Sequence, residues 1–328
     1  MTDSKNTDQK TALVTGANSG IGFETAYQLE AAGYDKVILA CRTLEKGDLA
    51  RKHLIKRGCK DIFESIAVDV SEVKSAINAS EELISKGYKI DLLILNAGMS
   101  SGKTIMKNST GVDLTFASTI IGHHALTINL LDKGGIRENG KIIIAGSESA
   151  RGDVPGITLP DLDKVAESDF NDNMHDTLKA YASAAYPGKY VPMNAYALAK
   201  LLVAWWSSSL ANRLPDGITV NAVSPGSVMS TSFARDQSWP MRKIMMPMMK
   251  VFGPMMGMAG PVSAAADRYL NVAHYGKEDS GKFYGSPPKK LVGKLEEQHT
   301  TLLHDVNKQE AGYKVIVELA GGIDYRSN

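Results

Sequence analysis

The segment Thr15-Gly16-Ala17-Asn18-Ser19-Gly20-Ile21-Gly22 has glycines spaced for a tight turn between a strand and a helix. A short apolar run, Thr11–Val14, precedes it, and a helical pattern over Gly20–Ala32 follows it. The first glycine lets the chain turn out of the strand, the second lets backbone approach a pyrophosphate, and the third lets the helix pack closely on the sheet. Unpaired N–H groups at the start of that helix favour phosphate. The segment predicts a dinucleotide-binding turn; outside this context it would indicate only a helix start.

The same alternation of apolar run and helical pattern continues outward from the turn. Near-continuous runs of Val, Ile and Leu are typical of strands buried on both faces. The predicted strands are Thr11–Val14, Lys36–Ala40, Phe63–Val68, Asp91–Leu95, Lys141–Ala145 and Ile218–Val223. The predicted helices are Gly20–Ala32, Leu44–Arg57, Glu72–Lys86, Gly111–Leu131 and Ala195–Leu214, with a last helix and strand near Ala259–Tyr284. We therefore expect an α/β fold: a single doubly wound Rossmann domain with a seven-stranded parallel sheet and helices on both faces.

Four segments lie outside this alternation of strands and helices: the N-terminal tail, an insertion, a Met-rich segment and a C-terminal extension. We expect residues 11–328 to form the domain after a polar N-terminal tail, residues 1–10. A long insertion, about 151–193, precedes the fifth predicted helix, and a Met-rich segment occupies about 230–261. Both follow carboxyl ends of predicted strands, where open α/β sheets bind ligands. The chain ends in a C-terminal extension, about 286–328.

Composition excludes several classes of protein. Lys and Arg total 37 against 36 Asp and Glu, a net charge of +1, which argues against general affinity for nucleic acid or anionic membrane. The two cysteines, Cys41 and Cys59, are too few for a disulfide framework and are read as free thiols in a reducing compartment. Neither a secretory signal nor an uninterrupted run of 18 apolar residues is found, so we expect a cytoplasmic protein.

The end of the second predicted strand indicates which dinucleotide binds. NAD-selective sites usually place an acid there to bond the ribose 2′-hydroxyl, whereas this strand ends in Ala40-Cys41-Arg42. The planar guanidinium of Arg42 suits a 2′-phosphate. We therefore expect NADP(H) rather than NAD(H); the alternative is a solvated arginine that opens the next helix.

Tyr196 and Lys200 stand four residues apart, which places both on one face of a helix. An ammonium and an oxidised nicotinamide both favour a phenolate, so the tyrosine can exchange a proton with a substrate oxygen. Ser147 ends the fifth predicted strand, where its hydroxyl can donate to that oxygen, with Ser149 as a second choice. The alternatives are a surface Tyr–Lys pair and a serine that caps its own turn.

Together these residues resemble the short-chain dehydrogenase/reductase family over roughly Thr11 to Gly226. The matching motifs are the glycine turn, Asp69-Val70, Asn96-Ala97-Gly98, Ser147, Tyr196-x-x-x-Lys200 and Pro225-Gly226. The resemblance implies that Asp69 lies near the adenine, that Lys200 bonds the nicotinamide ribose, and that the segment after Pro225 lies by the carboxamide. The resemblance also implies an NADP-dependent oxidoreductase that acts on a carbonyl or alcohol carbon. The implied cofactor-binding residues are Gly16, Asn18, Ser19, Gly20, Ile21, Gly22, Arg42, Asp69, Val70, Asn96, Ala97, Gly98, Tyr196, Lys200, Pro225, Gly226 and Val228.

Within the family, Ala40-Cys41-Arg42 and Gly122-His123 look most like the branch that holds retinol dehydrogenases and protochlorophyllide reductases. That branch carries asparagine three residues before this Gly-His pair, where this chain has Thr119. In the family this asparagine distorts the helix and holds a water that links the lysine to solvent. The resemblance therefore implies that with Thr119 the proton relay is slower, rerouted or absent. We expect catalysis to survive; the alternative is an NADP(H)-binding regulatory or scaffold protein with impaired catalysis. A hydrolase using Ser147 would need a nucleophile elbow, which its sequence context lacks.

Metal, substrate and subunit contacts are the remaining questions. His123 and His124 point about 100° apart on a helix and make a poor chelating pair, so we expect no metal and a packed or hydrogen-bonded His123.

The Met-rich segment, which contains Thr231, is interpreted as a lid over a bulky apolar substrate, as two packed helices, or as a shallow membrane contact. The insertion either walls the pocket or forms a subunit contact. Four apolar residues of the fifth helix form either a homodimer surface or ordinary core: Leu201, Leu202, Trp205 and Trp206.

Overall fold

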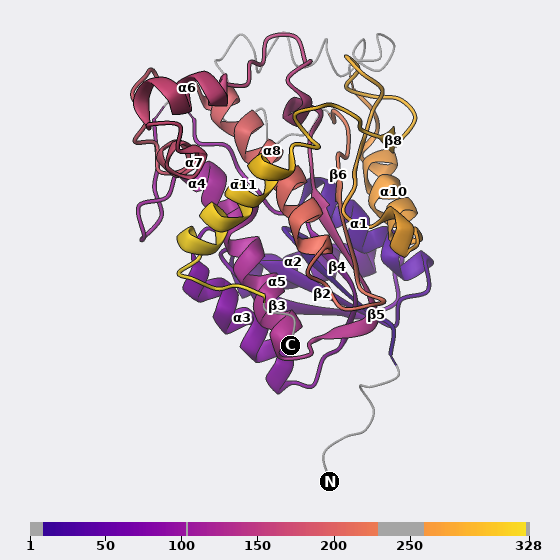
Figure 1. The fold of residues 1–328 in the computed structure, drawn as a ribbon. Helices are drawn as coiled ribbons and strands as arrows, with labels where there is room; N and C mark the ends of the chain where they lie inside the picture. Colours follow the sequence, from indigo (N-terminus) through magenta and orange to yellow (C-terminus); the bar gives the residue numbers. More distant parts are fainter. Residues whose placement is uncertain (1–8, 103, 229–258, 326–328) are drawn as a thin grey trace.

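One mixed sheet runs through the computed structural model, which describes residues 9–102, 104–228 and 259–325. The strand order is β3-β2-β1-β4-β5-β6-β7-β8 (Figure 1). The strands are β1 Thr11–Thr15, β2 Lys36–Cys41, β3 Phe63–Ala67, β4 Ile90–Leu95, β5 Ile136–Ala145, β6 Thr219–Val223, β7 Phe283–Gly285 and β8 Glu296–Glu297. The predicted doubly wound α/β fold is confirmed, but the strand count of seven is wrong. Seven strands are parallel, and the C-terminal extension adds β8 antiparallel to β7.

Strands buried on both faces explain the near-continuous apolar runs. In β1, Leu13 packs in one core with residues of α3, α5 and α8, while its neighbours Ala12 and Val14 pack in the other with residues of α1, α2 and α10. Successive residues of a strand point to opposite faces, so neither face of β1 can be polar. Figure 1 shows α8 beside α11 on one face of the sheet and α1 beside α10 on the other.

Four of the five helices predicted between the first six strands begin and end within about three residues of their predicted bounds. The α-helices of the described residues are α1 Gly20–Ala31, α2 Leu44–Lys56, α3 Val73–Ser85, α4 Leu114–Phe116, α5 Gly122–Asp132, α6 Leu162–Asp169, α7 Met174–Ala182, α8 Pro192–Ala211, α10 Val262–Ala273 and α11 Val306–Leu319. Within the described residues, three further segments are helical without being α-helices: the π-helical η2 Ala117–Ile121 and the 3-10 turns η3 Glu148–Arg151 and η5 Lys277–Asp279.

The fourth predicted helix is not continuous, contrary to expectation. It divides into α4, the π-helical η2 and α5, and Thr119 lies in the middle of η2. By length and composition alone, residues 114–132 could cross a membrane, but 89% of the apolar window is buried inside the fold. A core helix passes the same test, so this helix is weak evidence for a membrane protein.

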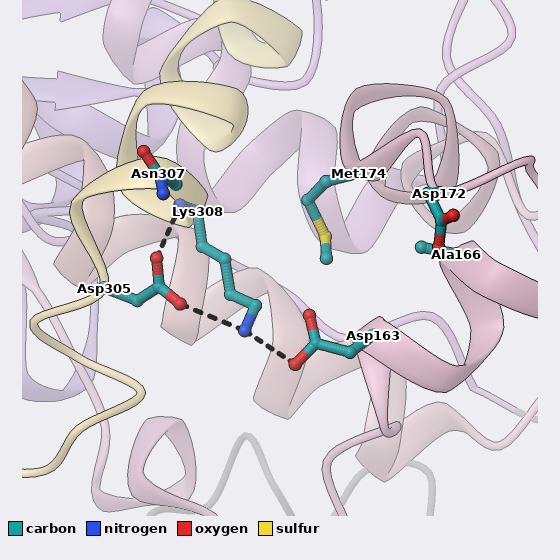
Figure 2. Close-up of a pocket in the computed structure, with 7 residues that line it drawn as sticks. All are labelled: Asp163, Ala166, Asp172, Met174, Asp305, Asn307 and Lys308. Carbon is teal, nitrogen blue, oxygen red and sulfur yellow. Dashed lines mark hydrogen bonds and ion pairs between the residues drawn. The ribbon is translucent and has the colours of Figure 1, made fainter.

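The insertion and the C-terminal extension pack on each other. Helix α7 of the insertion contacts α11 and α8. A cavity of about 280 Å³ lies between α6, α7 and α11 and contains none of the predicted site residues (Figure 2). At its edge the Lys308 ammonium lies 2.8 Å from Asp163 Oδ2 and 3.0 Å from Asp305 Oδ2. Lys308 therefore ties the insertion to the C-terminal extension.

The apolar residues of α8 that could have formed a homodimer surface are core instead. Leu201, Leu202, Trp205 and Trp206 are at most 1% exposed, and α11 of the same chain packs against α8. The predicted lid, about 230–261 and including Thr231, lies almost wholly outside the described residues, as does most of the predicted N-terminal tail.

Candidate active site

The glycine turn has the geometry that its three glycines predict. Gly16 and Gly20 have φ of +67° and +58°, which L side chains rarely adopt. A Cβ on Gly22 would lie 2.5 Å from the Gly16 carbonyl oxygen and 2.6 Å from Asn96 Nδ2, so only glycine fits. Helix α1 starts after an extended Ser19 whose side chain makes no capping hydrogen bond, and its first turn carries no acid. The N–H groups there are available to a phosphate, so the turn fits a dinucleotide.

The edge of β4 is fastened to this turn. Asn96 Nδ2 donates to the Thr15 carbonyl oxygen at 3.0 Å, and Ala97 N donates to Thr15 Oγ1 at 2.9 Å. Gly98 is exposed beyond them. The motif that the family resemblance places along the cofactor therefore lies directly beside the glycine turn.

Arg42 and Asp69 lie together at the ends of two neighbouring strands. Arg42 follows β2, and its Nε lies 3.5 Å from Asp69 Oδ2 in the segment after β3. The Arg42 side chain is 60% exposed, so its guanidinium remains open to an anion on its other side. Val70 is buried, and a Cβ on Gly122 would lie only 1.9 Å from its carbonyl oxygen. This close approach explains the glycine of the Gly122-His123 pair.

Ser147 lies in the turn that follows β5. Its backbone is extended, and its Oγ accepts hydrogen bonds from Ser149 N at 3.3 Å and from Ser149 Oγ at 3.0 Å. The Ser147 hydroxyl also acts on the phenol of Tyr196, whose pKa it lowers. Ser149 is buried and donates to Ser147, whereas Ser147 is partly exposed. The geometry therefore favours Ser147 over the second choice, Ser149, as the hydroxyl that contacts a substrate.

Tyr196 and Lys200 share one face of α8, as their spacing predicts. The Lys200 ammonium lies 5.7 Å from the Tyr196 ring centroid and donates to the Ala145 carbonyl oxygen at 2.6 Å. Burial lowers the pKa of Lys200 to about 8. Burial raises the pKa of Tyr196, the hydrogen bond with Ser147 opposes that rise, and the negative charge of Glu148 adds to it. Phenol, amine and hydroxyl therefore converge at the carboxyl end of β5.

Thr119 is buried in η2, and its hydroxyl finds no hydrogen-bond partner among the described residues. Its carbonyl oxygen lies 3.1 Å from His123 Nδ1, which must donate because a carbonyl only accepts. His123 Nε2 is then the acceptor for Thr15 Oγ1 at 3.0 Å. Burial lowers the pKa of His123 to about 4, so the ring is neutral. The expectation of a hydrogen-bonded His123 is confirmed, and its link to the glycine turn is a feature that the sequence did not predict.

The segment from Pro225 through Val228 is held by residues that the sequence reasoning missed. Gly226 N donates to Ser224 Oγ at 3.1 Å, and Val228 forms a β-bridge with Gly260. Glu148, directly after Ser147, accepts a hydrogen bond from the same Ser224 hydroxyl. A charged residue at the end of a buried strand was the available signal. Within the part of the chain that the structure describes, no cluster of three His, Cys, Asp or Glu side chains suits a metal ion.

Known proteins resemble this chain in sequence and in fold. The family model of the short chain dehydrogenases matches residues 10–189. The chain is 30% identical to WW domain-containing oxidoreductase from Gallus gallus over 230 residues, 69% of this chain and 51% of that protein. It is 30% identical to retinol dehydrogenase 13 from Mus musculus over 277 residues, 84% of this chain and 75% of that protein. The chain thus spans about half the length of the first relative and three quarters of the second.

Solved structures share the fold at lower sequence identity. Actinorhodin polyketide ketoreductase, solved with NADPH, superposes with a TM-score of 0.60 at 21% identity, covering 84% of this chain and 95% of that one. This likeness concerns the fold alone. The family match and the curated relatives decide the classification: the chain belongs to the short-chain dehydrogenase/reductase family.

Proposed function

We propose that the chain is an NADP(H)-dependent oxidoreductase that moves a hydride between the nicotinamide ring and a carbonyl or alcohol carbon. The observation that carries the proposal is the convergence of Ser147, Tyr196 and Lys200 at the carboxyl end of β5, one strand away from β4 and its Asn96-Ala97-Gly98 edge. Ligands of open α/β sheets bind at this end of the strands.

Each of the three side chains has a distinct task in this reaction. The bound cofactor supplies or accepts the hydride. Ser147 Oγ donates a hydrogen bond to the substrate oxygen, and Tyr196 gives that oxygen a proton during reduction or takes one during oxidation. Lys200, whose pKa lies at about 8, is mostly an ammonium at neutral pH and stabilises the phenolate that forms when Tyr196 has given up its proton.

Arg42 supports the choice of NADP(H) over NAD(H). Its exposed guanidinium lies at the end of β2, where the 2′-position of the adenosine ribose is expected, and it can bind a phosphate with two donors. We expect Arg42→Ala to weaken NADPH binding by about tenfold or more while leaving NADH binding within twofold, since hydrogen bonds to charged groups contribute about 1.5–3 kcal/mol. Cofactor fluorescence titration of both nucleotides measures this, and equal weakening of the two would refute the assignment.

The substrate is proposed to be a bulky apolar small molecule. The Met-rich segment supplies adaptable apolar side chains, and two of the proteins that resemble this chain are named for retinol and for a polyketide. The cytoplasmic location is part of the same proposal, with shallow membrane contact by the Met-rich segment as the alternative. A homodimer would have to use a surface other than α8, because α11 covers that face.

The deciding experiment compares the wild type with Tyr196→Phe. NADPH oxidation is measured against a panel of apolar ketones, aldehydes and enones, and NADPH binding is measured in parallel. We expect Tyr196→Phe to lose about 10²–10⁴-fold in turnover and to bind NADPH as the wild type does. Tyr34→Phe, at the opposite end of the sheet, is the matched control and keeps its activity. A regulatory or scaffold protein, the alternative that Thr119 in place of the family's asparagine favours, would bind NADPH in every variant and oxidise it in none.

A further inference from the structure

A buried carboxylate that the proposed reaction does not use lies directly beside the proposed catalytic serine. Glu148 follows Ser147 in the chain and is only 3% exposed. A carboxylate at that depth is strongly destabilising unless charged and hydrogen-bonding partners surround it. Its partners therefore show what the residue holds together.

The partners of Glu148 come from three other segments. Oε2 accepts from the Ser224 hydroxyl, after β6. Oε1 accepts from Ser286 N at 3.0 Å and Ser286 Oγ at 2.8 Å, after β7. Arg268 Nη1, on α10, lies 3.5 Å from Oε1. One carboxylate thus connects the Ser147 turn to the segments that follow β6 and β7 and to α10.

Ser224 passes this connection on to the predicted cofactor loop. Its hydroxyl gives its proton to Glu148 and accepts from Gly226 N at 3.1 Å. Arg268 Nη1 donates to the Ser224 carbonyl oxygen at 3.1 Å, and a Cβ on Gly226 would lie 3.0 Å from the same nitrogen. Gly226 has a φ of +77°, which L side chains rarely adopt, so glycine suits this close approach.

Arg151 is a second buried cation, and it binds residues of the C-terminal extension. Arg151 Nη1 donates to the Ser286 carbonyl oxygen and to Gln298 Oε1, the latter at 2.7 Å. Arg151 Nη2 donates to the Lys290 carbonyl oxygen at 3.2 Å. The segment after β7 is therefore clamped from both sides, and Glu148 cannot move without breaking several buried hydrogen bonds at once.

We propose that Glu148 is a positioning residue for the reaction: its carboxylate locks the Ser147 turn to the loop that begins at Ser224. The lock fixes the Ser147 hydroxyl relative to a nicotinamide ring bound beside Gly226. This inference rests on the proposed function, because it concerns the geometry of the same site.

The charge of Glu148 also acts on the phenol of Tyr196. The groups that face this phenol are Lys200 on the same helix, Ser147 and Glu148 from the turn after β5, and Tyr269 from α10. Burial is the main cause of the raised pKa of Tyr196, the Ser147 hydrogen bond lowers it, and the Glu148 charge raises it. Removing that charge therefore lowers the pKa of the phenol.

Glu148→Gln and Ser224→Ala separate the two effects. Glu148→Gln removes the charge and places an amide against donors, so we expect kcat/KM to fall by on the order of 10²-fold, as misplacement of reacting groups costs. In Glu148→Gln the pH at which ketone reduction declines should also be lower than in the wild type, because the Tyr196 phenol loses its proton at a lower pH. Ser224→Ala keeps the charge but cuts the link to Gly226. It should weaken NADPH binding about tenfold, a loss typical for a removed hydrogen bond to a charged network, without moving that pH.

Glu64→Gln is the matched control, because Glu64 is also a hydrogen-bonded carboxylate, bonded to Tyr88 and Lys86 beside β3. It should lower thermal stability without changing NADPH affinity or the pH profile. The proposal is overturned if Glu148→Gln behaves like this control. Should Glu148→Gln fail to fold, an NADPH affinity unchanged in both Ser224→Ala and Arg268→Lys overturns it instead. A wild type that binds NADPH but oxidises it with no carbonyl compound contradicts the proposed function, and the NADPH affinities of the variants still test the lock.

Discussion

Burial of the Lys200 ammonium reduces the stability of the folded protein, although the same ammonium serves the proposed reaction. Its ammonium is buried at the end of β5, and burial lowers its pKa from the ordinary 10.5 to about 8. A shift of that size corresponds to roughly 3 kcal/mol of folding free energy. A lysine retained at such a cost, one helical turn from Tyr196, is typical of functional sites rather than of cores.

The pH dependence of stability tests this cost. Below pH 8 Lys200 is charged in both the folded and the unfolded chain, so the penalty is fully present. Between about 8 and 10.5 the folded chain has released the proton while the unfolded chain still holds it, and stability rises with pH. We expect the stability difference between wild type and Lys200→Met to change by about 2–3 kcal/mol in favour of the wild type from pH 7 to pH 10. Urea unfolding at both pH values measures it.

Lys74→Met, on the exposed side of α3, controls for the general loss of a positive charge and should show a pH-independent difference. A difference between wild type and Lys200→Met that is the same at pH 7 and pH 10 would mean that Lys200 is not desolvated in the folded protein.

At the residue scale, the sequence predicted contacts between neighbours in the chain better than contacts between distant residues. The spacing of Tyr196 and Lys200 defines a shared helix face, and the structure has it. The contact between His123 and Thr15 joins positions 108 residues apart, and no local pattern encodes such a pair. The Glu148 network was missed for the same reason: its partners lie 76 to 138 residues away.

At the element scale, the interrupted fourth helix shows how tertiary contacts override a periodic pattern. The apolar pattern over 111–131 contains no proline and predicts one helix. The π-helical η2 instead lies where α5 begins to pack against Val70 and where His123 bonds the Thr119 carbonyl oxygen. Insertions of this type in helices often mark functional sites. The helix is therefore distorted at position 119 although this chain has threonine there.

Gly122 is the residue on which this arrangement depends. Helix propensity alone predicts that Gly122→Ala stabilises α5 by about 1 kcal/mol. The added Cβ would, however, lie 1.9 Å from the Val70 carbonyl oxygen, which is backbone and cannot rotate away. We expect the clash to outweigh the propensity, with a net destabilisation of about 1–3 kcal/mol. Because Val70 adjoins Asp69, NADPH binding should weaken as well.

Denaturant unfolding and cofactor titration of Gly122→Ala measure both effects. Gly102→Ala is the control, because a Cβ there meets nothing within 4 Å. If Gly122→Ala proved as stable as the wild type, α5 and the Val70 segment would have to lie farther apart than they do in the structure.

At the scale of the whole molecule, the sequence predicted the parallel strands of the sheet. It did not predict the structure of the C-terminal extension. Six of the eight strands contain a predicted apolar run, although β5 starts at Ile136 rather than at Lys141, and β8 is two acidic residues paired to β7. Nothing in Glu296-Glu297 predicts a strand, because its pairing comes from the clamp around Ser286 and Gln298. Similarly, the apolar face of α8 was predicted to be buried without indicating by what, and α11 supplies the cover.

Helix α11 packs closely on α8, so a larger side chain in this interface should disturb it measurably. A Cβ on Gly312 of α11 would lie 3.0 Å from Leu202 Cδ2 and 3.2 Å from Trp205 Cε3, and Trp205 Nε1 donates to the Leu302 carbonyl oxygen. His124 Nε2 bonds the Ile323 carbonyl oxygen beyond the end of α11. A large side chain at position 312 would therefore push α11 away from two fully buried tryptophans.

We expect Gly312→Leu to lose about 1–3 kcal/mol of stability through overpacking and to shift tryptophan emission to longer wavelength. Freed of its cover, the apolar face of α8 would also favour self-association, since large exposed apolar patches act as interfaces. Sedimentation should then show a concentration-dependent larger species for Gly312→Leu but not for the wild type. Val306→Leu, at an exposed position of the same helix, should change neither emission nor sedimentation. A wild type that is already dimeric, with unchanged emission in Gly312→Leu, would show that α11 does not decide the subunit state.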